Sequence, residues 1–172
     1  MAKLMRAVAW RRLERPYTRK SKYRSKDFIR GVPNSKVVKY VMGNKTKEFE
    51  YKVVLKSEAD IQLRHNSLEA ARKTTLKLLD RKAPLNYFFH LKVYPHHILR
   101  NNPLAAGAGA DRMSTGMSHS FGKPVGIAAR VRKGQEVFEV KVNKDKIDVA
   151  KRALKRARMK FPNDFKIVVQ KV

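Results

Sequence analysis

The run Gly116-Met117-Ser118-His119-Ser120 is the pattern closest to nucleophilic chemistry. A nucleophile elbow reads G-x-S-x-G and holds its serine on a sharp turn between a strand and a helix. Here Ser120 stands where the second glycine should be, and no strand-turn-helix pattern surrounds the run. The sequence therefore does not predict a serine hydrolase.

Five histidines offer ring nitrogens that could bind a metal. His96 and His97 are adjacent, so they would point apart at the end of a strand. His65, His90 and His119 have no carboxylate or cysteine beside them at ligand spacing. Because the chain has no cysteine, thiolate-bound zinc and disulfides are excluded. No metal site and no cofactor are predicted.

Phosphate-cradling and acid-base patterns are also incomplete. Gly107-Ala108-Gly109 is not followed by the Gly-Lys-Ser/Thr run of a phosphate loop, and no helix is expected to begin there. Acidic residues are too sparse for a carboxylate pair to stand out. The sequence therefore predicts a protein that is not an enzyme.

Charge is the strongest signal in the chain. Its 172 residues carry 41 Lys and Arg against 14 Asp and Glu, a net charge of +27. Such a chain repels itself unless a polyanion neutralises it, and nucleic acid is the leading partner, ahead of an anionic membrane surface. No apolar run approaches the roughly 18–20 residues needed to span a bilayer. Because the first ten residues also lack the apolar core of a secretory signal, a cytoplasmic protein is expected.

Residues 1–47 form a basic segment that Pro16 and Pro33 favour as extended. Its cations are interleaved with aromatic residues, a pattern typical of binding to phosphates and exposed bases, although a solvated charge run is the alternative. The predicted RNA-binding residues here are Arg11, Arg12, Arg15, Tyr17, Arg19, Lys20, Lys22, Tyr23, Arg24, Lys26 and Arg30.

A second cationic surface is predicted on a helix over about 145–161. Apolar residues at spacings of three and four define its inner stripe, so the cations lie on the outer side with almost no acid to pair with. Either phosphates or solvent could cover that side, and phosphate is favoured because the cations repel one another. The residues chosen as RNA contacts are Lys151, Lys155 and Arg158.

Hydrophobic periodicity predicts the elements that carry these surfaces. Strands are expected at 48–55, 85–94, 126–132, 136–142 and 165–169, with helices over 65–81 and 145–161. Lys133 and Gly134 are expected to form a hairpin turn between the third and fourth strands. Glu69 and Lys73 should pair on the outer side of the first helix. The fold class is therefore α+β, a two-layer domain of mixed or antiparallel sheet with two helices, formed by the whole chain 1–172.

Residues 101–126 form a loop between the halves of this domain. It contains five glycines and only three charged residues, and it is much longer than the roughly 4–6 residues of an ordinary connection, which favours a functional role. The residues predicted to act there are Asn101, Asn102, Gly107, Gly109, Arg112, Met113, Ser114, Gly116 and Met117.

Several segments are similar to one family over nearly the whole chain. They include RHNSLEAARKTTLKLL on the first helix and HLKVYPHHILRNNPLAAGAGADRMSTGMSHSFGKPVGIAARVRKGQ through the loop. The chain resembles the universal large-subunit ribosomal protein L-sixteen family, in the archaeal form of its L-ten-e branch. Arg64 and His65 begin the first segment and join the predicted RNA-binding set. The bacterial branch has an Arg-Met-Gly run, whereas Arg112-Met113 is followed here by Ser114.

The resemblance implies an α/β-hammerhead fold and a structural role in the large ribosomal subunit. It implies contacts with large-subunit ribosomal RNA, with transfer RNA in the A and P sites and with neighbouring ribosomal proteins. The loop at 101–117 would face the peptidyl transferase centre. No membrane contact and no homo-oligomer are expected. The alternative is a free nucleic-acid chaperone or a chromatin-type protein.

Overall fold

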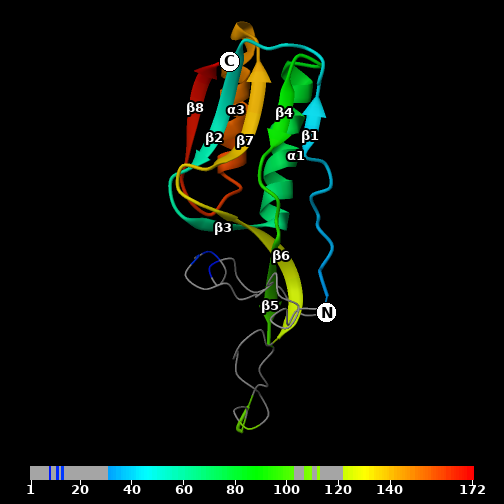
Figure 1. The fold of residues 1–172 in the computed structure, drawn as a ribbon, viewed down its shortest axis with the longest axis vertical. Coiled ribbons are helices and arrows are strands. Elements are labelled where there is room, and N and C mark those ends of the chain that lie inside the picture. The colour runs from blue at the N-terminus through cyan, green and yellow to red at the C-terminus, as the bar shows by residue number, and fades with distance from the viewer. Residues whose placement is uncertain are drawn as a thin grey trace.

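The computed structural model describes residues 8, 11, 13, 31–102, 107–109, 112 and 122–172. Within these residues the strands form two antiparallel sheets, one of five strands and one of three. Figure 1 shows two α-helices side by side on one face of the five-stranded sheet. The three-stranded sheet extends from one end of this body. The predicted two-layer α+β class is confirmed, and every strand pair is antiparallel.

Both sheets join strands that are distant in sequence. The five-stranded sheet has the order β1 (Val41–Gly43), β4 (Phe88–Leu91), β7 (Glu136–Val142), β2 (Tyr51–Ser57) and β8 (Phe165–Lys171). The three-stranded sheet has the order β3 (Ile61–Arg64), β6 (Lys123–Val131) and β5 (His97–Asn101). The helices are α1 (His65–Lys82) and α3 (Ile147–Arg158), the latter preceded by the 3-10 turn η3 (Lys144–Lys146).

The core lies between the five-stranded sheet and the helix pair. Val53 pairs with Val140 and Leu55 with Phe138 across β2 and β7, and all four side chains are buried. Small residues let α3 pack closely on its neighbours, since its buried positions are Ala150, Ala153, Leu154 and Ala157. Aromatic rings also pack against one another in this core. The centroid of the Phe138 ring lies 5.2 Å from that of Phe89 and 5.6 Å from that of Phe161.

The two predicted helices are confirmed, with modest changes at their ends. The first begins at His65 as expected and ends at Lys82. The second is shorter than predicted, because residues 144–146 form a 3-10 turn and the α-helix ends at Arg158. The strand predicted at 48–55 starts later, at Tyr51, and the strand predicted at 85–94 is reduced to Phe88–Leu91. Such shifts are the usual uncertainty of element ends read from periodicity.

The predicted hairpin between β6 and β7 is wrong. A turn does form, with the Gln135 N–H donating to the Arg132 carbonyl at 3.1 Å and Gly134 in the left-handed region at φ 81°. However, both edges of β6 are taken by β3 and β5, and both edges of β7 by β2 and β4. The turn therefore carries the chain from one sheet to the other. The local signal for a turn was correct, but nonlocal partners decided the pairing.

Three strands were not predicted. β1 lies within the basic segment 1–47, β3 lies directly before α1, and β5 lies directly before the loop. They span three to five residues each, too short for a period of two to stand out. Together β3 and β5 provide both partners of the long strand β6. Figure 1 shows β5 and β6 extending away from the helices, so this pair carries the chain towards the predicted loop.

Candidate nucleic-acid interface

The outer face of α3 presents cations at helical spacing. Lys151, Arg152, Lys155 and Arg156 are all exposed, while the alanines and leucine between them face the core. The cations in the last turn also interact favourably with the negative end of the helix dipole, which explains part of the clustering. Lys151 extends along the face towards the first turn of α3. This surface is the one predicted from periodicity.

A groove runs between α1 and α3 beside this face. Its volume is about 490 Å³. Its apolar part comes from Leu78, Val149 and Met159, and its rim is cationic. We call it the α1–α3 groove, and its lining residues are Leu78, Lys82, Val149, Arg152, Lys155, Arg156 and Met159. No acidic residue is among them. The sequence had placed Arg152 and Arg156 on the outer surface but had not associated them with Lys82 of α1.

Not all predicted contacts on α3 are equally available. Lys151 lies 4.0 Å from Asp148, and the Arg158 guanidinium donates to Asp164 at 2.5 Å. In the part of the chain that the structure describes, Lys155 has no such acid partner. The roles of Lys151, Lys155 and Arg158 towards RNA stay predictions. Their environments differ, and Lys155 is the one whose charge is not matched by a carboxylate.

The acids of the chain are used instead on the sheet face that the helices leave open. Lys92 lies 2.6 Å from both Glu136 and Glu139, and Lys52 lies 3.3 Å from Glu136. Lys56 and Lys141 complete this sheet charge cluster. These pairs neutralise cations within the framework. Cations without a carboxylate partner therefore lie at other sites, including the α1–α3 groove.

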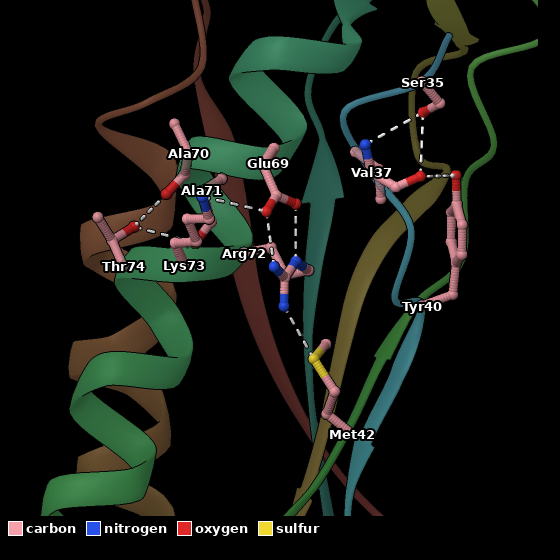
Figure 2. A network of polar contacts seen from close by, with 10 residues as sticks. All are labelled: Ser35, Val37, Tyr40, Met42, Glu69, Ala70, Ala71, Arg72, Lys73 and Thr74. Carbon is pink, nitrogen blue, oxygen red and sulfur yellow. Dashed lines mark hydrogen bonds and ion pairs between the residues drawn. The ribbon is translucent and has the colours of Figure 1, made fainter.

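A third acid, Glu69, is used on the side of α1 that faces β1. Figure 2 shows the Glu69 carboxylate facing the Arg72 guanidinium, which donates to it at 2.6 and 2.8 Å. Arg72 also reaches the Met42 sulfur on β1 at 3.0 Å. The predicted pair of Glu69 with Lys73 is present at 3.6 Å. The Arg72 contact is closer and two-pronged, so it is the stronger link, and it ties β1 to α1.

The sheet charge cluster predicts a dependence of stability on pH. Hydrogen bonds from Lys92 and Lys52 lower the pKa of Glu136 to about 2, from an ordinary value of 4.5. Its contribution is present above the ordinary value and is lost as pH falls towards 2. Between about pH 5 and pH 3, the wild type should lose on the order of 1 kcal/mol more unfolding free energy than Glu136→Gln, after allowing for solvent screening. Urea unfolding at the two pH values measures this.

The half-buried His97 also affects how stability changes with pH, but its effect cancels in this comparison. Burial, together with the charge of Arg130, lowers the pKa of His97 to about 4. Its protonation also destabilises the fold as pH falls, but equally in both proteins, so it cancels in the comparison. Identical losses in the wild type and Glu136→Gln would show that the cluster contributes nothing.

Arg64 and His65 lie where β3 passes into α1. His65 is buried, and its Nδ1 accepts a hydrogen bond from the Lys36 N–H at 3.2 Å. Burial and the charges of Lys36 and Arg64 lower the pKa of His65, which favours the neutral ring. Its side chain therefore fastens the segment before β1 to the start of α1. RNA contact by His65 and Arg64 stays a prediction, and the structure places the histidine ring inside.

Within residues 1–30, the structure describes three positions, namely Val8, Arg11 and Leu13. The Arg11 carbonyl accepts from the Gln62 N–H at 3.0 Å, and Arg130 donates to the Leu13 carbonyl at 3.0 Å. This part of the segment therefore lies along the outer edge of β3. The other predicted contacts fall outside the described residues, namely Arg12, Arg15, Tyr17, Arg19, Lys20, Lys22, Tyr23, Arg24, Lys26 and Arg30.

The predicted loop begins and ends on the β5–β6 pair. Asn101 closes β5, and the Gly122 backbone approaches it so closely that a Cβ on Gly122 would lie 3.1 Å from the Asn101 carbonyl carbon. Gly107, Gly109 and Arg112 are exposed, and the Arg112 N–H donates to the Gly109 carbonyl at 3.0 Å. Asn102 is also described. Met113, Ser114, Gly116 and Met117 lie outside the described residues.

The described part of the chain has neither a cluster of metal ligands nor a helix that could span a membrane. No three His, Asp or Glu side chains there come together as metal ligands would. Among the helices that the structure describes, none is long and apolar enough to cross a bilayer. The arrangement is thus a strongly basic α+β protein whose exposed groups suit a polyanionic partner.

The chain belongs to the ribosomal protein L16p/L10e family, whose sequence pattern matches residues 14–168. It is 51% identical over 155 residues to a protein of Methanococcus maripaludis, covering 90% of each chain. It is 47% identical over 166 residues to one of Archaeoglobus fulgidus, covering 96% of this chain and 92% of that one. Both relatives carry the name large ribosomal subunit protein uL16. The resemblance deduced from the sequence is confirmed.

Proposed function

We propose that the protein is a structural, non-catalytic constituent of the large ribosomal subunit, acting as one domain in the cytoplasmic ribosome. The observation that carries the proposal is the family match over residues 14–168. The named relatives are proteins of that subunit. The net charge of +27 supports ribosomal RNA as its main partner. Neighbouring ribosomal proteins are expected partners as well.

The cationic surfaces would bind RNA mainly through phosphates. Arg152, Lys155 and Arg156 of α3 are exposed, and within the described residues no carboxylate pairs with them. Lys151 and Arg158 are each matched by one acid, Asp148 and Asp164. Phosphate contacts fix position and orientation without reading sequence. The basic segment 1–30 and the residues Lys151, Lys155 and Arg158 would share this role, with the α1–α3 groove beside them.

The loop would reach towards transfer RNA in the A and P sites near the peptidyl transferase centre. Support comes from its length and glycine content and from its place beyond the β5–β6 pair, which extends away from the body. The residues proposed to face that region are Asn101, Asn102, Gly107, Gly109, Arg112, Met113, Ser114, Gly116 and Met117.

Sedimentation of gently lysed cells tests the proposed function. The protein is expected to co-sediment with the large subunit and to stay with it in moderate salt. The alternative, a free nucleic-acid chaperone or chromatin-type protein, would leave it in the soluble fraction or release it readily as salt rises. Its appearance in the soluble fraction alone would overturn the proposal.

Deleting residues 105–116 is expected to leave the domain folded but to impair the subunit. The ends of the loop already lie side by side, since Gly122 packs against the Asn101 backbone, so a shorter connection can close. Circular dichroism should be unchanged, and the rate of peptide synthesis by subunits that carry the variant should fall. A variant in which residues 105–116 are replaced by a glycine-serine segment of the same length serves as the control for loop length. Loss of folded protein would show that the loop is structural instead.

A further inference from the structure

The chain between β4 and β5 alternates strictly between buried and exposed side chains. Leu91, Val93 and Pro95 are buried, whereas Lys92, Tyr94 and His96 are exposed. Successive side chains of an extended segment point to opposite sides, so the exposed three share one side. This side therefore offers a cation and two rings in a row.

Tyr94 is the centre of a group of three rings. Its ring centroid lies 5.4 Å from that of Tyr40, with only 26° between the ring planes, and 4.4 Å from that of His96. Tyr94 still keeps 49% of its surface exposed, and His96 is exposed as well. A single exposed tyrosine is common on protein surfaces and does not by itself indicate a binding site. Three rings in contact, with about half of the central residue open, form an exposed aromatic cluster.

The rings are held in place by their backbone and neighbours. The Tyr40 hydroxyl donates to the Val37 carbonyl at 3.4 Å, and the Leu91 N–H donates to the Tyr40 carbonyl at 2.8 Å. Figure 2 shows this hydroxyl meeting the Val37 carbonyl, where the Ser35 side chain also donates. The His96 N–H donates to the Tyr94 carbonyl at 3.0 Å across Pro95. These bonds fix the backbone that carries the three rings and the hydroxyl of Tyr40.

The charges around the rings indicate what they would bind. Lys92 is matched by Glu136 and Glu139 at 2.6 Å, so the side that carries Tyr94 offers ring surface there rather than free charge. Lys36 and Lys39 are exposed shortly before Tyr40, and in the described part of the chain neither is paired with an acid. Exposed aromatic rings, with unmatched cations a few residues away along the chain, suit an unpaired nucleobase of RNA.

We propose that Tyr94, supported by Tyr40 and His96, is a stacking platform for an unpaired nucleobase. The proposal rests on RNA being the partner, and it adds a base contact to the phosphate contacts proposed for α3 and for residues 1–30. Stacking accepts any base, because every base has a π-face, so no sequence preference is implied.

Two matched RNA probes separate stacking from charge. The full chain is titrated with a short single-stranded oligoadenosine and with a sugar-phosphate oligomer of equal length that lacks bases. The wild type should bind the first more tightly, and Tyr94→Ala should reduce the ratio of the two affinities by at least about fivefold. Tyr94→Phe should keep the ratio, and so should Val38→Ala, which trims another exposed side chain on the same approach to β1.

Salt dependence gives a second readout. Because Tyr94 carries no charge, Tyr94→Ala should leave the slope of log affinity against log salt unchanged. The proposed stacking platform would be contradicted if Tyr94→Ala left the affinity ratio unaltered, or if Tyr94→Phe lowered the ratio as much as Tyr94→Ala. Either result would leave the proposed RNA binding intact. If the wild type bound neither probe nor large-subunit RNA, the proposed RNA binding itself would fail. Should Tyr94→Ala not fold, His96→Ala takes its place, and an unchanged ratio there would likewise overturn the platform.

Discussion

The triple variant Arg152→Gln, Lys155→Gln, Arg156→Gln is expected to bind large-subunit RNA roughly 50- to 150-fold more weakly near 0.15 M salt, if each cation meets a phosphate. All three side chains are exposed at the α1–α3 groove, and no acid lines that groove. The slope of log affinity against log salt should become shallower by about two to three units. Filter binding over a series of salt concentrations measures both quantities.

A charge-matched control decides whether position matters. Lys133→Gln, Lys166→Gln and Lys171→Gln remove the same net charge from exposed sites away from α3. If the groove is the contact surface, this control should weaken binding much less. Equal losses in the two triple variants would show that only total charge counts and would remove the groove from the proposed interface.

Gly43→Ala is expected to destabilise the fold by about 2–5 kcal/mol. Gly43 lies in the left-handed region at φ 86°, where a Cβ costs about 1–2 kcal/mol. The added Cβ would also lie 2.3 Å from the Tyr87 carbonyl oxygen, and that oxygen already accepts the Asn44 N–H at 2.9 Å. The clash with fixed backbone must shift β1 off β4, at a further cost of about 1–3 kcal/mol.

Two other glycines separate the two costs. Gly134 has a similar φ of 81° with nothing near its Cβ position, so Gly134→Ala should cost about 1–2 kcal/mol from backbone strain alone. Gly31 has neither a positive φ nor a close neighbour, and Gly31→Ala should be nearly neutral. Urea unfolding ranks the three. If Gly43→Ala destabilised the fold no more than Gly134→Ala, the close approach of the Tyr87 carbonyl would add no cost in stability.

Local patterns predicted the helices well because both helices have an apolar stripe at the period of the helix itself. In α1, Leu68, Ala71, Thr75 and Leu79 recur at helical spacing and are buried, while Leu78 is only half-buried. The cationic face of α3 followed from the same period. In contrast, β3 and β5 have only four and five residues, and their pairing depends on β6, which lies far away along the chain. No window of sequence contains that partner.

The sequence could not predict which acids pair with which cations. The sequence showed that acids are few, but only the fold showed where they are engaged. Glu136 and Glu139 meet Lys52 and Lys92 because β2, β4 and β7 are adjacent in the sheet. Lys82 likewise joined the cations of α3 only because α1 packs against α3. The rings of Tyr40 and Tyr94 are more than fifty residues apart in sequence, so their stack was not foreseeable.

By itself the sequence determined the class of the protein, because composition, charge and helical periodicity are properties of local segments and of the whole chain. The net charge of +27, the stripes of the two helices and the long glycine-containing loop are all of this kind. The tertiary structure decided which strands pair, which charges cancel and which side chains meet. These outcomes depend on contacts between distant segments, which are fixed only when the sheets and helices pack into one core.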